Sequence, residues 1–426
     1  MPKLRIVTQE GLASEELSAY KAVSPADFKQ LESLLPVLTG KHILHLSSSA
    51  NGGGVAELLT SGCALERALG LRSQWAIIED AMPFFVITKK IHNGLQGESL
   101  TLSPLEQKTY LNITPTLRAD LETLLHKLQP DIIILHDPQP LPFIEIAKRF
   151  APTLLRLHID LSTPYQPMLD FLKPLIRQAS TIIISSNNYR VAFGGYPPEH
   201  IAVIRPAIDP FTEKNRPLDK DIAEEILTKH NIDITRPFIT QISRFDPWKD
   251  PLGAIEAYRF AKHSVPKLQL ILAGFIEASD DPEALAWVDK TKAAVQNDPD
   301  VFIFSDLSQL KDNMSDSLFI NALNTLTSCT LQMSRREGFG LTITEAMWKG
   351  RVVIARPSRG AELQIINGEN GYISDTSETI AGHVIKTLAD SKTAQAIGRA
   401  AQASVKENFF LPRYISHNCK VYQNFL

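Results

Sequence analysis

The chain has 426 residues, of which 44% are hydrophobic and 21% are charged, and its formal net charge at pH 7 is -3. A chain of this length exceeds one ordinary hydrophobic core, so we expect two domains. The small negative charge excludes a global basic field of the kind that attracts nucleic acid or an anionic membrane.

The three cysteines, Cys63, Cys329 and Cys419, are odd in number and widely spaced. This argues against a disulfide framework and for a reducing compartment. The sequence has no long apolar segment near its start and no apolar run that approaches the ~18 residues of a membrane span. We therefore expect no signal peptide, no membrane partner and a soluble, cytoplasmic protein.

Short apolar runs rich in β-branched residues alternate with helical patterns along both halves of the chain. The strands predicted in the first half are His42–Ser47, Gln74–Ile78, Asp131–His136, Leu154–His158, Thr181–Ser185 and Ile201–Arg205. Those predicted in the second half are Phe238–Ser243, Leu268–Ala273, Val301–Phe304, Cys329–Met333 and Val352–Ala355. Helical periodicity is present over Val55–Leu69, Leu252–His263, Pro282–Gln296 and Ser377–Ala389. Because the strands lack strict alternation, we expect parallel sheets buried on both faces, in two doubly wound α/β domains.

The boundary between the halves is expected near residues 205–210. Pro206 and Pro210 restrict the backbone there, and a polar stretch follows. The predicted domains are therefore 1–208 and 209–408. Ligands of open α/β sheets bind beyond the carboxyl ends of the strands, so the segments that follow strands carry the candidate sites.

The most informative of these segments runs from Ser334 to Ala346. It follows a buried strand and leads into a helix predicted over Leu341–Lys349, which Gly350 closes. Its glycines let the backbone twist and approach a ligand closely, and the free N–H groups at the helix start form an anion site. The candidate phosphate-binding residues are Gly338, Phe339, Gly340, Leu341 and Thr342.

Two carboxylates, Glu337 and Glu345, flank this turn. Carboxylates suit hydroxyl groups and the turn suits a phosphate, so the predicted ligand is a sugar nucleotide. A glycosidase would instead use two carboxylates as acid and base across the substrate bond, but the glycines and the helix start favour phosphate chemistry. No metal site is predicted, because the D-x-D pairs at 219/221 and 298/300 lie in polar connections and no His/Cys spacing matches zinc.

Two further glycine-rich or basic segments follow strands. Gly52 and Gly53 would let a phosphate or sugar lie against backbone N–H groups, although a tight strand-to-helix turn is the alternative. Arg244 and Lys249 would converge on a diphosphate and stabilise charge on a leaving group. A solvated loop that caps the next helix through Asp250 is the alternative there.

Polar residues also follow two strands of the first half. His158, with Asp160 beside it, would bond a sugar hydroxyl or a reacting oxygen, and a structural histidine is the alternative. Asp137 and Gln139 would recognise acceptor hydroxyls, or else belong to a proline-bounded turn.

Residues 84–97 show no clear helical or strand period, and they are predicted as a loop and a helix end. Polar side chains in this segment would line a carbohydrate pocket. They are Lys89, His92, Asn93 and Gln96.

Together these residues resemble a known family. Glu337–Glu345 matches the E-x7-E element of retaining GT-B glycosyltransferases, in the class called family 4, and Arg244 and Lys249 match its phosphate-contacting pair. More of the chain is similar to trehalose synthases of the glycosyltransferring type, which join a nucleotide-activated glucose to free glucose. The matching segments span nearly the whole chain and are Gly52–Glu57, Thr88–Lys89 with His92–Asn93 and Leu95–Gly97, Asp137–Pro140, His158–Ser162, Ile208–Pro210 with Lys214–Asn215, Asp281–Glu283 and Glu345–Gly350.

The resemblance implies a GT-B fold, with two Rossmann-like domains facing a central cleft and a terminal helix, 409–426, that completes the first domain. It implies retaining transfer of glucose from UDP- or ADP-glucose to free glucose, forming or reversibly cleaving trehalose. The alternatives are a trehalose phosphorylase, which would use the same Arg and Lys for free phosphate, and a related GT-B transferase with another small sugar or polyol acceptor. A non-catalytic binding protein is disfavoured by the intact Arg, Lys and paired Glu.

The resemblance also assigns roles to residues. The catalytic set is His158, Arg244, Lys249 and Glu337. The donor set adds Glu345, Gly52, Gly53 and residues 338–342, and the acceptor set is His92, Asn93, Gln96, Asp137, Gln139 and Asp160. The expected partners are the nucleotide sugar, the small sugar acceptor and a second copy of the chain in a homodimer, with no nucleic acid. No tightly bound cofactor is implied, and Mg²⁺ would stimulate only together with the nucleotide sugar.

One segment departs from the family. A glycine pair and a glutamine are usual near residues 359–364, where Arg359 and Glu362 bring charge into this chain. The segment follows a strand of the predicted donor domain, so the preference for donor or acceptor is a point where this chain would differ from its family.

Overall fold

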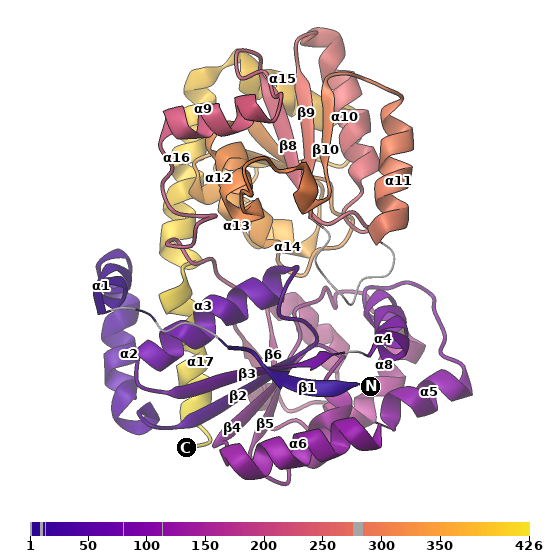
Figure 1. The fold of residues 1–426 in the computed structure, drawn as a ribbon, viewed down its shortest axis with the longest axis vertical. Coiled ribbons are helices and arrows are strands. Elements are labelled where there is room, and N and C mark those ends of the chain that lie inside the picture. The colour runs from indigo at the N-terminus through magenta and orange to yellow at the C-terminus, as the bar shows by residue number, and fades with distance from the viewer. Residues whose placement is uncertain (1, 9–11, 13, 80, 113, 276–283) are drawn as a thin grey trace. The chain divides into compact units, whose positions relative to one another are not determined.

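The computed structural model describes residues 2–8, 12, 14–79, 81–112, 114–275 and 284–426. These residues form two compact units (Figure 1). The first contains the described residues up to Ala207 together with Leu411–Leu426, and the second contains the described residues from Ile208 to Phe410. The terminal helix α17 (Leu411–Gln423) therefore packs in the first unit, against α2 (Pro25–Leu38) and α3 (Gly54–Ala68).

The first unit is built on a sheet in the order β1-β3-β2-β4-β5-β6-β7. β1 is antiparallel to β3, and the other neighbours are parallel, as the apolar runs predict. The strands are β1 (Lys3–Ile6), β2 (His42–Ser47), β3 (Arg72–Glu79), β4 (Ile132–His136), β5 (Thr153–Arg156), β6 (Thr181–Ile184) and β7 (Ile201–Val203).

Helices cover both faces of this sheet, because the strands carry apolar side chains on both faces. In β2, Leu44 and Leu46 join a core with Phe85, whereas Ile43 joins a second core with residues of α2, α3 and α17. The remaining helices are α1 (Ser14–Val23), α4 (Met82–Leu95), α5 (Pro104–Leu111), α6 (Pro115–Leu128), α7 (Ile144–Ala147) and α8 (Gln166–Ile176), with short 3-10 helices at Leu141–Phe143, Asn187–Phe193 and Pro198–His200.

Helix α4 corrects the prediction of a loop over residues 84–97. The segment is helical from Met82 to Leu95, with a proline in its first turn. Most of its circumference is buried, including Lys89 and Asn93 as well as its apolar residues, so no exposed polar face marks the 3.6-residue period in the sequence.

The second unit has an all-parallel sheet in the order β10-β9-β8-β11-β12-β13. The strands are β8 (Phe238–Ile242), β9 (Gln269–Ala273), β10 (Val301–Phe304), β11 (Cys329–Gln332), β12 (Val352–Ala355) and β13 (Tyr372–Ile373). The helices are α9 (Lys220–Lys229), α10 (Pro251–Ser264), α11 (Ala284–Val295), α12 (Asp316–Leu326), α13 (Leu341–Trp348), α14 (Arg359–Glu362), α15 (Ser377–Ala389) and α16 (Ser391–Asn408), with a 3-10 turn at Leu307–Gln309.

The second sheet also has a core on each face. Ile239 of β8 packs with residues of α10 and α15, and its neighbour Phe238 packs with residues of α9 and α12. The prediction of two doubly wound α/β domains is confirmed. In the described part of the chain, no helix combines the length and apolar character needed to cross a membrane.

Candidate active site

The strand, turn and helix predicted around the two glutamates are present in the second unit. β11 ends at Gln332 and α13 begins at Leu341, with Gly340 between them at a φ of 84°. This left-handed conformation suits glycine, which has no Cβ. The side-chain amide of Gln364 donates to the carbonyl oxygens of Phe339 at 2.6 Å and Gly340 at 3.2 Å, and these hydrogen bonds fix the backbone of the turn.

A second glycine holds this turn from the side. The backbone N–H of Gly360 donates to the carbonyl oxygen of Glu337 at 2.9 Å. A Cβ at Gly360 would lie only 2.5 Å from the carbonyl oxygen of Phe339, so only glycine allows this approach. The charged neighbours Arg359 and Glu362 bond each other at 2.7 Å on the exposed side of α14.

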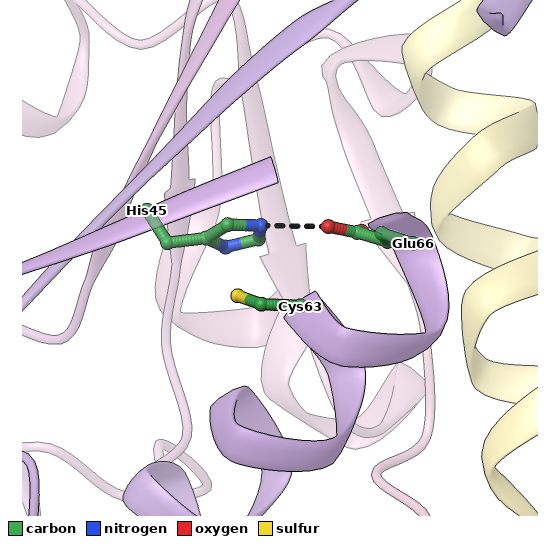
Figure 2. A group of neighbouring side chains, drawn as sticks. All are labelled: His45, Cys63 and Glu66. Atoms are coloured by element: carbon green, nitrogen blue, oxygen red, sulfur yellow. Dashed lines mark hydrogen bonds and ion pairs between the residues drawn. The ribbon is translucent and has the colours of Figure 1, made fainter. Parts of the chain in front are cut away.

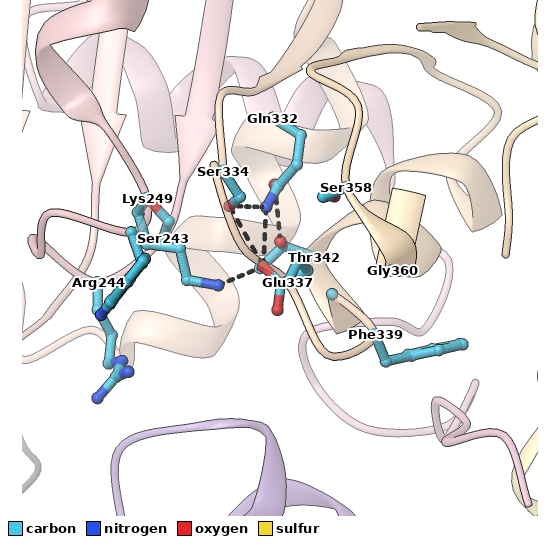
Figure 3. Close-up of polar contacts among 12 residues, drawn as sticks. Ser243, Arg244, Lys249, Gln332, Ser334, Glu337, Phe339, Thr342, Ser358 and Gly360 are labelled. Atoms are coloured by element: carbon cyan, nitrogen blue, oxygen red, sulfur yellow. Dashed lines mark hydrogen bonds and ion pairs between the residues drawn. The ribbon is translucent and has the colours of Figure 1, made fainter. Parts of the chain in front are cut away.

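Glu337 is the centre of a buried polar cluster (Figure 3). Its Oε2 contacts the ammonium of Lys249 and accepts hydrogen bonds from Gln332 Nε2 at 3.2 Å and Ser334 Oγ at 3.3 Å. Thr342, in the first turn of α13, donates to the other end of the Gln332 amide at 3.2 Å. The cluster therefore joins the loop after β8, the end of β11 and the start of α13, where an open α/β sheet binds its ligands.

Arg244 lies on the same loop as Lys249 but takes another direction (Figure 3). Its guanidinium pairs with Asp246 at 3.3 Å, and its side chain is 37% exposed. Asp246 is buried and also accepts the backbone N–H groups of Trp248 and Lys249. Asp250 caps α10 by accepting the N–H of Gly253, so the helix-capping role and the basic pair occur in the same loop.

Glu345, the second glutamate of the pair, lies inside α13 and is 1% exposed. Its Oε1 is 2.7 Å from the ammonium of Lys214, whose side chain is 10% exposed. The indole of Trp348 donates to the carbonyl oxygen of Asn215 at 3.0 Å, which ties the helix to the same segment. A buried ion pair of this kind fixes the segment against α13, and contact of Glu345 with a ribose stays a prediction.

The first unit brings Asp137 and His158 together. Asp137 follows β4 with a left-handed φ of 65°, and its Oδ1 accepts the backbone N–H of His158 at 2.7 Å. His158 is partly exposed as a residue, and its Nε2 lies 3.0 Å from Nδ1 of His136. Burial, and then the charge of Arg156, hold the pKa of His158 well below its usual value, so the ring is neutral at pH 7.

The other predicted acceptor residues lie in two groups. On α4, Lys89, His92, Asn93 and Gln96 follow the spacing i, i+3, i+4, i+7, so they share one face of the helix. After β4, the side-chain oxygen of Gln139 is buried without a hydrogen-bond partner among the described residues.

Asp160 and the glycines near α3 have local structural roles. Asp160 is buried, and its Oδ1 accepts the N–H of Ser162 at 2.8 Å. Gly52 and Gly53 have φ values of 70° and 135°, and Gly53 caps the start of α3. Apart from its chain neighbours, no atom lies within 4 Å of where a Cβ of Gly53 would be, so the space beside this glycine is open.

The D-x-D pairs are held by protein groups. Asp298 and Asp300 both bond the ammonium of Lys262 at 2.9 Å, and Asp300 also bonds Arg236. Asp219 caps α9 through the N–H of Asp221. The resemblance element Asp281–Glu283 lies outside the described residues.

Sequence reasoning missed the partners behind the candidate residues. Gln332 and Ser334 bind Glu337, and their signal was a pair of polar residues at the end of an apolar strand. His45, Cys63 and Glu66 also come together, with ligand-type atoms within 4.8 Å of one another (Figure 2). Their spacing in the sequence matches no metal motif, and only the packing of β2 on α3 reveals the group.

Each of the two units matches a known protein family. The family model "Trehalose synthase, N-terminal domain" matches residues 45–191, and "Glycosyl transferases group 1" matches residues 222–404. The chain is 36% identical to a trehalose synthase of Rubrobacter xylanophilus over 96% of this chain and 97% of that protein. It is 33% identical to a trehalose synthase of Thermococcus litoralis over 98% and 99% of the two chains.

The chain belongs to the trehalose synthase family of glycosyltransferases. Like others of this family, it is a hexosyltransferase with the GT-B fold of two parallel-sheet α/β domains. Similarity to a trehalose phosphorylase of Pleurotus pulmonarius is lower, at 26% identity over 85% of this chain and 54% of that protein.

Solved structures agree on the fold of this trehalose synthase family member. An α,α-trehalose-phosphate synthase of Burkholderia xenovorans, in complex with glucose-6-phosphate, matches with a TM-score of 0.70 at 14% identity, over 90% of this chain and 100% of that chain. Anabaena HepE, in complex with UDP and glucose, matches with a TM-score of 0.64 at 19% identity, over 89% and 99% of the two chains.

Proposed function

We propose that this enzyme transfers glucose, with retention of the anomeric configuration, from UDP- or ADP-glucose to free glucose, so that it forms or reversibly cleaves trehalose. The observation that carries the proposal is the contact of Lys249 with Glu337 beside the start of α13. It combines a cation for a phosphate, a carboxylate for hydroxyl groups and a helix N-terminus at one edge of a parallel sheet. Relatives named trehalose synthases match nearly the whole chain, which favours this sugar pair.

In this proposal the second unit binds the donor. Lys249 and Arg244 neutralise the departing diphosphate, with N–H groups of the turn at Gly340–Thr342. Arg244 is half-exposed and its partner Asp246 is on its own loop, so the guanidinium can reach a phosphate by a side-chain rotation. The held conformation of Gly340 pre-orients the N–H groups, so little reorganisation accompanies the build-up of charge.

Glu337 accepts hydroxyl groups of the donor glucose, and Glu345 acts at the nucleotide ribose. Three donors already fix Oε2 of Glu337, namely Lys249, Gln332 and Ser334. This arrangement suits a carboxylate that orients a sugar, and neither glutamate need be a nucleophile.

The first unit supplies His158 near the reactive carbon of the donor, and the acceptor glucose is oriented by Asp137, Gln139, His92, Asn93, Gln96 and Asp160. The acceptor hydroxyl attacks from the face that the diphosphate leaves, and the leaving phosphate oxygen takes the acceptor proton. This order of events retains the configuration and needs no protein base. Binding both substrates supplies proximity.

We further propose that no cofactor is tightly bound, that Mg²⁺ acts only with the nucleotide sugar, and that the enzyme works as a cytoplasmic homodimer. Incubation with UDP-glucose or ADP-glucose plus glucose, with and without Mg²⁺, tests the donor and the metal together. A trehalose phosphorylase would instead release glucose 1-phosphate from trehalose plus phosphate and would ignore nucleotides. Release of glucose 1-phosphate alone would therefore replace this proposal.

A further inference from the structure

A chain of hydrogen bonds leads from His158 into the core of the first unit. Nε2 of His158 lies 3.0 Å from Nδ1 of His136, and Nε2 of His136 lies 3.0 Å from Nδ1 of His45. Nε2 of His45 then lies 3.1 Å from Oε2 of Glu66. His136 and His45 each use one ring nitrogen for the neighbour on one side and the other nitrogen for the neighbour on the other side. The three imidazoles therefore connect His158, which is partly exposed, to the buried carboxylate of Glu66.

The sheet places these rings in line. β2, β4 and β5 are neighbours in the sheet; β2 carries His45, β4 ends at His136, and β5 ends two residues before His158. The rings are stacked at centroid distances of 5.3 Å for both adjacent pairs, with interplanar angles of 29° and 19°. His45 and His136 are 3% and 1% exposed, so water does not compete for their ring nitrogens.

Glu66, on α3, is the anionic end of the chain. Oε2 also accepts the hydroxyl of Ser73 at 2.6 Å, and Oε1 accepts that of Tyr422, on α17, at 3.1 Å. Burial alone would raise the pKa of Glu66, but the charge of His45 and the hydrogen bonds from His45, Ser73 and Tyr422 outweigh it and lower the pKa. Glu66 is therefore a carboxylate at neutral pH and accepts a hydrogen bond from Nε2–H of His45.

This direction fixes the tautomer of every ring. If Nε2–H of neutral His45 donates to Glu66, its Nδ1 must accept from Nε2–H of His136, and Nδ1 of His136 must accept from Nε2–H of His158. Nδ1 of His158 is then a lone-pair acceptor. If His45 carries a second proton, the two ring-to-ring bonds reverse, the bond from His45 to Glu66 keeps its direction, and His158 presents Nδ1–H as a donor.

We propose that Glu66, His45 and His136 are positioning residues that form a proton relay to His158. A proton taken up at Nδ1 of His158 displaces the Nε2 proton of His158 to His136, and the Nε2 proton of His136 to His45. The added charge comes to rest on His45 beside Glu66, and both other rings stay neutral with inverted tautomers. The inference rests on the proposed function only for the place of His158 at the donor sugar.

The surroundings of the three rings favour positive charge on His45, beside Glu66, over positive charge on His136 or His158. Burial first, and then the charges of its histidine neighbours and Arg156, hold the pKa of His136 well below its usual value, as burial and Arg156 do for His158. The remaining titratable groups against the relay are Cys63, Tyr414, Cys419 and Tyr422 around Glu66, and Asp137 at the backbone of His158. His158 can thus switch between accepting and donating a hydrogen bond without placing a cation next to a sugar carbon that itself becomes positive.

A metal site is the competing interpretation of one end of this chain, since Cys63 lies beside His45 and Glu66 (Figure 2). Burial, and then the charge of Glu66, raise the pKa of the Cys63 thiol, whereas a metal ligand must be a thiolate. Oε2 of Glu66 is also already occupied by two donors, Ser73 and His45. These contacts favour the hydrogen-bonded relay.

NMR of the full chain with ¹⁵N-labelled histidine rings tests the relay without any substrate, so its outcome is separate from that of the activity assays. At about pH 8 the relay predicts the Nε2–H tautomer for His45, His136 and His158. On acidification, His136 and His158 should switch together to Nδ1–H while only His45 becomes imidazolium. Mixed tautomers at the start, or an imidazolium on His158, would overturn the proposal.

Substitutions test which residues control the tautomer switch of the relay. Glu66→Gln removes the anion that faces Nε2 of His45, so the tautomer switch and the acid limb of the kcat profile should both move to lower pH. Cys63→Ser is the matched control and should leave the switch unchanged. Stoichiometric bound metal that Cys63→Ser removes would instead establish the metal site. If Glu66→Gln does not fold, His136→Gln should uncouple His158, and a switch that persists there would contradict the relay.

Discussion

The ammonium of Lys249 contacts Oε2 of Glu337 although the two residues are 88 positions apart in the sequence. The pair lies where the loop after β8 meets the turn before α13, and two neutral donors, Gln332 and Ser334, complete the shell of the same oxygen. In the proposed function, the cation serves the phosphate and the anion serves the sugar hydroxyls of one ligand, a nucleotide sugar. The separate contributions of the two residues can be tested.

Substitution Glu337→Gln should reduce turnover more than donor binding. The amide keeps the size of the side chain but loses the charge that strengthens its bonds to sugar hydroxyls in the transition state. We expect kcat to fall about 10²-fold while the Kd for the donor changes much less. Isothermal titration and initial rates measure the two quantities, with Glu378→Gln on the exposed side of α15 as control. Equal losses in binding and turnover would remove the proposed role.

The substitution Lys249→Met should lower both kcat/KM and the affinity of the enzyme for the nucleoside diphosphate. Loss of the cation removes a charge that neutralises the leaving group, and kcat/KM should fall about 10²-fold or more. The exposed Lys392→Met is the matched control and should retain full activity. Inhibition by free nucleoside diphosphate provides a second readout, since its affinity should fall in Lys249→Met alone. Unchanged affinity for the diphosphate would place the phosphate elsewhere.

Substitution Gly360→Ala should destabilise the second unit. The new methyl group would lie 2.5 Å from the carbonyl oxygen of Phe339, and overpacking of this kind costs about 1–3 kcal/mol. Gly382→Ala, in the interior of α15 with no atom within 4 Å, should instead gain about 0.5–1 kcal/mol. Thermal midpoints of the two variants should therefore move in opposite directions from that of the parent. A Gly360→Ala midpoint at or above the parent value would show that the turn has more room than the structure gives it.

The stability of the first unit should fall in mild acid. Folding lowers the pKa values of His136 and His158, so the unfolded chain binds more protons than the folded one and stability rises with pH. This contribution is complete above the unfolded value of about 6.5 and declines as pH falls below it. In His136→Gln one of these groups is absent, so thermal midpoints between about pH 7.5 and 5.5 should decline less steeply. A slope as steep as that of the parent would contradict the shift for His136.

Apolar patterning was enough to predict the two sheets, because strands buried on both faces read as continuous apolar runs. His42–Ser47, Val301–Phe304 and Val352–Ala355 have the predicted bounds. β1 and β13 are edge strands of only a few residues, and β1 has little burial, so neither leaves a clear pattern. Helix α4 was missed for the opposite reason, since burial on most sides erased its polar face.

The candidate site was predictable where chemistry is local. The turn between Glu337 and Glu345 follows from its glycines and its position before a helix. Contacts between distant segments were not visible, and these include Lys249 with Glu337, Lys214 with Glu345, and the rings of His45 and His136. Such pairs depend on the order of the strands in the sheet, and a single sequence does not reveal that order.

The most direct test is product analysis after incubation with UDP-glucose or ADP-glucose and free glucose. We predict trehalose with an α,α linkage and one nucleoside diphosphate released for each trehalose formed, with one donor preferred. Absence of transfer from both donors, with glucose 1-phosphate released from trehalose and phosphate, would contradict this prediction and establish a phosphorylase.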